Sequence, residues 1–263
     1  MQVTRTVQIT DLHILADDND DICGVRPHRS LARVIDDINT LSPIADMVIA
    51  SGDLTDAGSS AAYRRLREAL LQLKCAVYVM AGNHDETEAM RFGLPGENIF
   101  HQTSVDCAGW KVLLIDSKTP DASYGTVSKE EIARIDQVLD ETDSSILLAM
   151  HHTPLRLCAS PSCQMRNADE FLTAIKNHRQ IKGLVAGHTH NEVDEMLGQL
   201  RIMTTPSTMV QVTHNQDEAC KANDEFWDYH TADISRHGYR VIDLHADGCL
   251  STEVRWVNAE SHG

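Results

Sequence analysis

The sequence has no long apolar run, no leading signal-like segment and no regular cysteine framework. No stretch of about 18 apolar residues occurs in the 263 residues, so we expect no membrane-spanning helix. The chain starts with a strand-like stretch, and we therefore expect a protein that is not exported. Its seven cysteines are odd in number and scattered, which is more typical of reduced thiols in a cytoplasmic protein than of a disulfide scaffold.

Positive charge is also scarce, and the formal net charge is −16. A surface of that sign repels phosphate backbones, so we expect no nucleic-acid polymer as a partner. A small phosphate ester is compatible with this charge, because bound metal cations would invert the local field. We therefore expect a small-molecule substrate and no membrane partner, and the composition leaves a homo-oligomer open.

Three groups of residues resemble metal sites but lack a necessary part. Cys158 and Cys163 have no further thiol partners nearby in the sequence, so we expect free structural cysteines and no zinc site. The acidic run over residues 17–21 lacks the glycine and the distal glutamate of an EF-hand loop, and we interpret it as a solvated loop. Three histidines in a polar stretch are expected to be solvated or locally bonded: His214, His230 and His237.

Short apolar runs of strand length alternate with segments of helical period. The strand-like runs cover residues 7–9, 47–49, 77–79, 112–115, 146–148 and 183–185. Helical stripes cover residues 31–41, 66–73, 132–139 after a capping box at Ser128, and 171–175 after a possible cap at Asn167. This alternation indicates an α/β protein whose helices cover sheet faces.

The pattern changes near residue 193. Alternating strand-like pieces with turns at Gly198 and at Asp247-Gly248 predict antiparallel hairpins there, and a second sheet is the economical interpretation. We treat residues 1–263 as a single domain in which 214–263 forms a loop and hairpin region. The polar, acidic stretch 214–238 is interpreted as an excursion outside the core.

Five clusters of potential metal ligands each follow an apolar, strand-like run. They are Asp11-Leu12-His13, Gly52-Asp53, Gly82-Asn83-His84-Asp85, His151-His152 and Gly187-His188-Thr189-His190. Strand ends at one edge of an α/β sheet are where ligand sites form, because the loops converge there while the sheet holds them. The five clusters are therefore predicted to form one site.

The residue types in these clusters indicate transition metals. Asp, His and one Asn are oxygen and nitrogen donors suited to Mn, Fe, Zn or Co. The spacing of two in Asp-x-His and His-x-His directs both side chains of a pair to the same side of an extended segment. Each cluster alone has an ordinary alternative, since Asp53 could cap a turn and Asp85 could cap a helix. All five in this order and context favour the metal site.

With these blocks, the sequence resembles the calcineurin-like metallophosphoesterase superfamily. Residues 7–13, 52–56, 151–154, 166–167 and 205–208 further resemble its class III cyclic nucleotide phosphodiesterase branch, which is related to glycerophosphodiesterases. The resemblance implies a four-layer α/β/β/α sandwich of two mixed sheets with flanking helices. Thr153-Pro154 departs from the pattern of that branch, and residues 155–165 after it are expected to line the pocket.

The resemblance also implies a centre of two divalent or mixed-valence transition metal ions. Asp11, His13 and His190 would bind the first ion, Asn83, His151 and His188 the second, and Asp53 would bridge both. Seven ligand side chains give each ion four ligands only if one carboxylate is shared, which fits an intermetal separation of about 3.5–4 Å. A hydroxide held between the ions would attack the phosphorus atom.

His84 is predicted to be the catalytic residue. It follows Asn83, and the two residues together are expected to contact the substrate. Histidine suits protonation of a leaving alkoxide because its pKa lies near working pH. Asp85 is expected either to orient His84 or a metal-bound histidine, or to cap the next helix.

The implied activity is hydrolysis of a small phosphodiester, first of all 3′,5′-cyclic AMP. The enzyme alternatives are a glycerophosphodiesterase, a broad-specificity phosphomonoesterase or a protein phosphatase. The negative net charge argues against a DNA nuclease. The non-enzyme alternative is a scaffold protein that keeps the fold without the chemistry, but such relatives usually lack ligands that are all present here.

Overall fold

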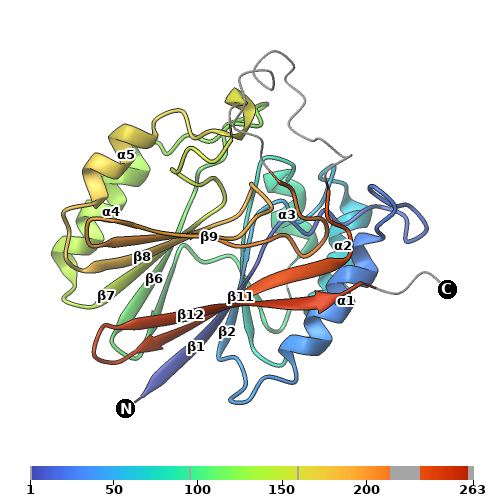
Figure 1. The fold of residues 1–263 in the computed structure, drawn as a ribbon, viewed down its shortest axis with the longest axis horizontal. Helices are drawn as coiled ribbons and strands as arrows, with labels where there is room; N and C mark the ends of the chain where they lie inside the picture. The colour runs from blue at the N-terminus through green and yellow to red at the C-terminus, as the bar shows by residue number, and fades with distance from the viewer. Residues whose placement is uncertain (1, 95, 159, 214–231, 260–263) are drawn as a thin grey trace.

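The computed structural model, which describes residues 2–94, 96–158, 160–213 and 232–259, has two six-stranded sheets packed between two layers of helices (Figure 1). The helices α1, α2 and α3 lie on one side of the sheets, and α4 and α5 lie on the other. The four-layer α/β/β/α sandwich expected from the sequence is therefore confirmed. No helix within the described ranges is long and apolar enough to cross a membrane.

The first sheet contains the first strand-like runs of the sequence together with the C-terminal hairpin. Its strands, in spatial order, are β12 (Leu250–Asn258), β11 (Arg236–His245), β1 (Val3–Ile9), β2 (Met47–Ser51), β3 (Ala76–Met80) and β4 (Ile99–Phe100). The strands from β1 to β4 are parallel, and β11 is antiparallel to both β1 and β12. All five residues of β2 are buried, because both faces of the sheet are covered, and this explains its continuous apolar run.

The second sheet repeats this plan with the middle of the chain. Its strands, in spatial order, are β5 (Ser104–Cys107), β6 (Trp110–Ile115), β7 (Ser145–Met150), β8 (Ile181–Ala186), β10 (Leu200–Thr204) and β9 (Val193–Leu197). The four central strands β6, β7, β8 and β10 are parallel, and an antiparallel strand closes each edge. Parallel central strands end at the same edge, so the loops that follow them are neighbours.

The helices bury the apolar stripes that the sequence shows. They are α1 (Pro27–Ile38), α2 (Ser60–Leu70), α3 (Thr87–Gly93), α4 (Lys129–Glu141) and α5 (Ala168–Ile175), with a short 3-10 helix over Pro161–Cys163. Ser128 caps α4 by accepting a hydrogen bond from the Glu131 N–H, as the capping box predicts. Asn167 occupies the N-cap position of α5, but its side chain bonds to the main chain of Val127 instead of capping the helix.

Two apolar cores hold the layers together. One lies between α1, α2 and the outer face of the first sheet. The other fills the space between the sheets and continues to α4 and α5. Only a few residues of the first sheet, such as Met47 and Ile49, face this second core.

The C-terminal strands differ from the expectation. They do form antiparallel hairpins at the predicted turns, but they do not make a sheet of their own. The hairpin of β9 and β10 joins the second sheet, and the hairpin of β11 and β12 joins the first, where six residues of β1 pair with β11. The reason is that β1 would otherwise leave one edge of the first sheet unpaired. The short strands β4 and β5 were not predicted, whereas α3 was expected only in the alternative in which Asp85 caps a helix.

The expectation for Cys158 and Cys163 is wrong. The structure joins them in a disulfide, with their Cα atoms 6.4 Å apart across the short 3-10 helix. Four other cysteines among the described residues are free: Cys23, Cys75, Cys107 and Cys249. The acidic run at residues 17–21 is exposed, as expected. His237 is buried and locally bonded, whereas His214 and His230 lie outside the described residues.

Candidate metal centre

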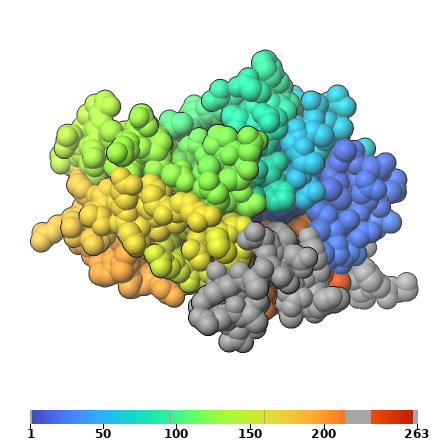
Figure 2. Space-filling model, turned by 90° about the horizontal axis from the view of Figure 1, so that it is seen from above, coloured from blue at the N-terminus to red at the C-terminus, as the bar shows by residue number. Residues whose placement is uncertain are grey.

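The five predicted clusters meet at one end of the two sheets. They follow β1, β2, β3, β7 and β8, so three come from the first sheet and two from the second. Seen from above, the part of the chain that carries the first clusters, in blue to teal, lies opposite the green-to-yellow part (Figure 2). Donor atoms of six predicted ligands, together with those of His84 and His152, form overlapping groups whose members lie within 4.8 Å of one another.

The first group contains Asp11, His13 and His190. The Nε2 atoms of His13 and His190 are 3.3 Å apart, and the Nε2 atom of His190 is 3.3 Å from Asp11 Oδ1. All three side chains are buried. The residues come from opposite ends of the sequence, and the main-chain N–H of His188 holds them together by donating to the Asp11 carboxylate.

The second group is centred on His151. Its Nε2 atom is 3.1 Å from Asn83 Oδ1 and 3.3 Å from Asp53 Oδ2. The other carboxylate oxygen of Asp53 accepts a hydrogen bond from the main chain of His84. Since Asp53 also lies 3.8 Å from His13 Nε2, its carboxylate is between the two groups, at the position that a bridging ligand needs.

His188 lies beside His151 and His152, all three of them buried. His152 is not placed like a ligand, because both of its ring nitrogens have protein partners. Its Nε2–H donates to Ser123 O, and its Nδ1 accepts from the Ser117 hydroxyl. The imidazoles of His151 and His152 are thus both buried, and His152 is bonded to the protein on both ring nitrogens.

The orientation of two imidazoles is set by main-chain carbonyls. His151 Nδ1–H donates to Ser51 O at 3.0 Å, and His190 Nδ1–H donates to Val210 O at 2.8 Å. In the neutral form of each ring, which is the form that binds a metal, the Nε2 atom then carries the lone pair and faces the carboxylates. This arrangement, in which a second partner fixes the tautomer, is typical of histidines that bind metals.

The backbone at the predicted ligands is unusual. Seven described non-glycine residues have a positive φ, and five of them are predicted ligands: Asp11, His13, Asp53, His188 and His190. This region of φ/ψ space costs free energy for residues with a Cβ atom, and such residues concentrate where function requires an exact placement. The clustering therefore points independently to the same site.

Glycines allow the loops to approach so closely. A Cβ atom on Gly52 would lie 2.5 Å from His151 Nδ1, and a Cβ atom on Gly82 would collide with the Asp53 carboxylate. A side chain at either position would push a predicted ligand out of place.

His84 lies at the rim, with about a third of its side chain exposed. Its Nδ1–H donates to the main-chain oxygen of Asp56 at 2.8 Å, so its Nε2 atom is the one that remains for a substrate. The Asp56 carboxylate accepts from His13 Nδ1 at 3.2 Å. Asp56 thus orients one predicted ligand and the predicted catalytic residue, a role that the sequence analysis missed although Asp56 ends the block Gly52–Asp56.

Asp85 does neither of the things expected of it. Its buried carboxylate accepts from the main-chain N–H groups of Leu54, Thr55 and Gly82 and from the Tyr63 hydroxyl, at 2.9–3.1 Å. The N-cap of α3 is Glu86, which makes no side-chain cap. Asp85 therefore joins the loops after β2 and β3, which carry Asp53 and Asn83.

The electrostatics of the site favour binding of cations. Burial disfavours the charged form of Asp53, but the neighbouring His151 outweighs it and holds the pKa of Asp53 well below its usual range. For His151, burial is outweighed by the charge of Asp53 and the hydrogen bond to it, which raise the pKa to about 9. Burial lowers the pKa of His188 far below its usual value and that of His152 to about 3.

A small pocket of about 40 Å³ opens beside His13 and His84. Its other walls are Asp56 and four less polar residues that the sequence analysis did not identify, namely Ile22, Cys23, Met209 and Val210. They come from a turn after β1 and from the segment after β10, and no local pattern marks them as neighbours. The prediction that residues 155–165 line the pocket stays a prediction.

These features are found together with clear sequence similarity. Residues 4–192 match the family model of the calcineurin-like phosphoesterases, so the chain belongs to the calcineurin-like phosphoesterase family. It is 32% identical to the 3′,5′-cyclic adenosine monophosphate phosphodiesterase CpdA of Escherichia coli (strain K12), over 95% of this chain and 88% of that protein. It is 30% identical to the CpdA of Pseudomonas aeruginosa, over 96% of this chain and 89% of that protein.

A solved structure supports the fold at greater distance. The dimetal phosphatase from Danio rerio superposes with a TM-score of 0.62, covering 97% of this chain and 98% of its own, at 12% sequence identity. At that identity the likeness concerns the arrangement of sheets and helices alone.

Proposed function

We propose that the chain is a dinuclear metal-dependent phosphodiesterase that hydrolyses a 3′,5′-cyclic nucleotide, with 3′,5′-cyclic AMP as the first substrate. The observation that carries the proposal is the convergence of seven oxygen and nitrogen donor side chains at one end of the two sheets. The substrate rests on the relatives of nearly equal length that are named as cyclic AMP phosphodiesterases.

The donor set suits two divalent or mixed-valence ions of Mn, Fe, Zn or Co. Asp11, His13 and His190 would hold one ion, Asn83, His151 and His188 the other, and Asp53 would lie between them. When bound, such ions supply Lewis-acid activation of water and offset negative charge on phosphoryl oxygens. Burial would raise the pKa of Asp11 and of Asp53, but neighbouring histidines outweigh it and lower both pKa values. Both carboxylates are therefore ionised and can act as metal ligands.

His84 would contact the phosphate and hold the proton that the leaving alkoxide needs. Its Nδ1–H is bonded to Asp56 O, so its Nε2 atom is available at the rim of the site. Asn83 is held in place by Lys118, whose ammonium group donates to the Asn83 main-chain oxygen at 3.1 Å. The less polar wall of Ile22, Met209 and Val210 would receive the organic part of the substrate.

The test is a screen of the full-length protein, reconstituted with each metal, on cyclic nucleotides, glycerophosphodiesters and phosphomonoesters. We expect 5′-AMP to form from 3′,5′-cyclic AMP, and we expect Asp53→Asn to remove both metal and activity. Activity on glycerophosphodiesters with none on cyclic AMP would overturn the substrate but keep the class. Absence of hydrolysis of every ester by metal-loaded protein would favour the scaffold alternative.

A further inference from the structure

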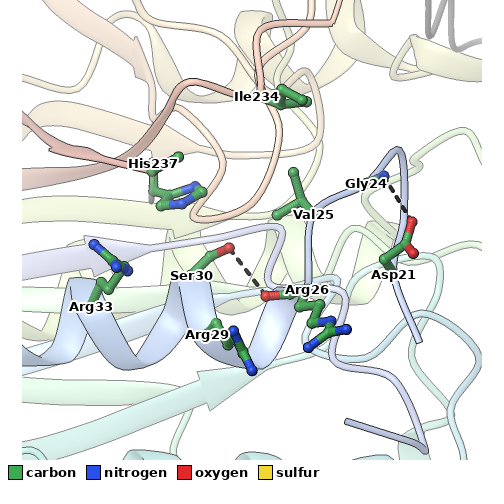
Figure 3. A pocket seen from close by; sticks show the side chains of 10 residues that line it. Asp21, Gly24, Val25, Arg26, Arg29, Ser30, Arg33, Ile234 and His237 are labelled. Carbon is green, nitrogen blue, oxygen red and sulfur yellow. Dashed lines mark hydrogen bonds between the residues drawn. The ribbon is translucent and has the colours of Figure 1, made fainter. Parts of the chain in front are cut away.

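Two parts of the chain border the metal centre. Towards α1, Val25 packs against Met209 and Val210 and separates the small pocket beside His84 from a second pocket of about 360 Å³, which lies between α1 and the segment that leads into β11 (Figure 3). None of the described residues that line this second pocket is a predicted metal ligand. The other border is the segment 116–126 after β6, and its contacts lead to predicted ligands.

The segment 116–126 supplies no predicted ligand, but it forms a closed loop at the end of β6. Lys118 makes an antiparallel bridge with Gly125, and the Thr126 N–H donates to Ser117 O at 3.0 Å. These contacts bring the two ends of the segment together. The loop therefore has a defined position at the end of the second sheet.

This loop holds the buried imidazole of His152 through three residues. The Ser117 hydroxyl donates to His152 Nδ1 at 2.9 Å and accepts from the His152 main-chain N–H at 3.1 Å. His152 Nε2–H donates to Ser123 O at 3.1 Å. Gly125 lies so close to the ring that a Cβ atom on it would be 2.4 Å from His152 Cγ. The loop thus fixes both the position and the tautomer of this ring.

The ring of His152 packs in turn against two predicted ligands. Its centroid is 4.5 Å from the ring centroid of His188 and 4.8 Å from that of His151. All three rings are buried, and in a closely packed interior a shift of one ring displaces its neighbours. The same loop also contacts the third predicted ligand of this metal position, because Lys118 Nζ donates to Asn83 O at 3.1 Å.

The other metal position is supported by a different part of the chain, the segment after β10. The Ser207 hydroxyl donates to the main-chain oxygen of Asp11 at 2.8 Å, and His190 Nδ1–H donates to Val210 O at 2.8 Å. The two predicted metal positions therefore have separate supports within the fold.

We propose that Ser117 and His152 are positioning residues that set the affinity of the second metal position, which is formed by Asn83, His151 and His188. Ser117 fixes the ring of His152, and this ring fixes the directions of the two ligand imidazoles. Imidazoles that are already oriented bind an ion more tightly, because less conformational freedom is lost on binding. The inference rests on the proposed dinuclear centre.

The first test follows Mn²⁺ binding to metal-free, full-length protein by electron paramagnetic resonance, which distinguishes an exchange-coupled pair of ions from a single ion. Ser117→Ala leaves two groups of His152 without their partner. We expect the free Mn²⁺ concentration that gives half-maximal coupled pair to rise by about tenfold or more, as is typical when a group that orients a ligand is removed. Ser30→Ala removes a similarly buried hydroxyl from α1 and should leave this concentration unchanged.

The outcomes of this test separate two possible failures. An unchanged concentration in Ser117→Ala, with a coupled pair in the unaltered protein, would overturn the present inference alone. Absence of a coupled pair from the unaltered protein at every Mn²⁺ concentration would overturn the dinuclear centre itself. Circular dichroism of the metal-free variants verifies that each is folded.

The second test assigns the effect to one metal position by calorimetric titration with Zn²⁺. His13→Ala/His190→Ala removes two ligands of the first position and keeps the second. His151→Ala/His188→Ala removes two ligands of the second position and keeps the first. Added to these backgrounds, Ser117→Ala should weaken Zn²⁺ binding about tenfold where the second position is kept and less than about twofold where the first is kept.

Ser207→Ala is the matched control for this assignment, because the Ser207 hydroxyl holds the main chain of Asp11 in the first position. It should weaken Zn²⁺ binding only in the background that keeps the first position. Equal effects of Ser117→Ala in both backgrounds would indicate a general loss of structure and would contradict the proposal.

A third measurement uses the unaltered protein and does not depend on the folding of any loop variant. In protein labelled with ¹⁵N at histidine, nuclear magnetic resonance during a Zn²⁺ titration should show the ring nitrogens of His151 and His188 changing on metal binding. His152 should keep its Nε2–H form throughout. Direct binding of Zn²⁺ by His152 would make it a ligand and would overturn its positioning role.

Discussion

At the scale of single residues, the site separates ligands from the residues that hold them. The carbonyl oxygens of Ser51 and Val210 orient His151 and His190, and the Asp56 carboxylate orients His13. His84 differs from these because it is partly exposed and its Nδ1 is bonded to a main-chain oxygen. This difference supports the proposed division between His84, which would act on the substrate, and the residues that would bind metal.

Replacement of His84 should therefore affect turnover and spare the metals. We expect His84→Ala to lower kcat by about 10²–10⁴-fold, the range typical of a general acid, because the leaving group loses its proton donor. Metal content, measured by mass spectrometry of the reconstituted protein, should equal that of the unaltered protein. His101→Ala removes an exposed histidine after β4 and is the matched control. Loss of metal in His84→Ala would contradict this division of roles.

The charge state of His151 predicts how metal binding depends on pH. In metal-free protein its pKa is raised to about 9, so Nε2 carries a proton at pH 7 that an ion must displace. Uptake of metal at pH 7 should release protons, and affinity should increase as the pH rises toward about 9. Calorimetry in buffers of different ionisation enthalpy measures both. An affinity that stays constant between pH 7 and pH 9 would show that this proton does not compete with the metal.

At the scale of elements, the loops after the parallel strands hold the ligands, and Asp85 joins two of these loops. Its carboxylate accepts hydrogen bonds from the loop after β2, from the loop after β3 and from Tyr63 on α2. A single buried side chain therefore fixes the relative positions of Asp53 and Asn83.

We expect Asp85→Asn to destabilise the protein by about 3 kcal/mol, because the new amide would turn one of its groups toward donors that need an acceptor. Urea unfolding of the metal-free protein measures this free energy. Tyr63→Phe removes one of the bonds to Asp85, together with the bond that the Tyr63 hydroxyl accepts from Glu86 N–H, and should cost about 1–2 kcal/mol. If both variants lose the same stability, Asp85 does not join the loops in the way described.

At the scale of the whole molecule, the two sheets are joined by polar contacts as well as by the apolar core. Arg240 on β11 is buried, and its guanidinium group donates to Thr205, Thr252, Val193 and Thr204. Burial lowers the pKa of Arg240. The hydrogen bonds to these oxygens offset the free-energy cost of burying the charged group. These hydrogen bonds link β11 and β12 of the first sheet to residues of β9 and β10 in the second, in addition to the apolar core between the sheets.

Arg240→Lys should cost about 2–3 kcal/mol, because an ammonium group cannot reach acceptors on several strands at once. Thermal or urea unfolding measures the loss. Arg236→Lys on the same strand is the matched control. Its ion pair with Asp233 joins side chains that are 46% and 38% exposed, and its guanidinium group lies over the Trp256 ring, so the substitution should change stability by about 1 kcal/mol at most. Equal effects of the two substitutions would mean that Arg240 does not join the sheets.

The sequence determined the positions of most strands and helices and the identity of the predicted ligands. Both are local properties of the sequence. A strand-like apolar run and the ligand cluster that follows it can be recognised without knowing which element packs against them. Within each sheet the clusters are neighbours because parallel strands end at one edge, whereas the meeting of the two sets of clusters depends on how the two sheets pack.

Only the tertiary structure decided which sheet each C-terminal hairpin joins, that Asp56 and Asp85 support the site, and that two pockets lie on opposite sides of Val25. Each of these depends on contacts between residues far apart in the chain, such as Asp11 with His188 or Met209 with His237. Such contacts leave no periodic trace in the sequence, since they arise when separate elements pack together. The seven donors could therefore be recognised from the sequence, whereas the residues that hold them in place could be identified only from the tertiary contacts.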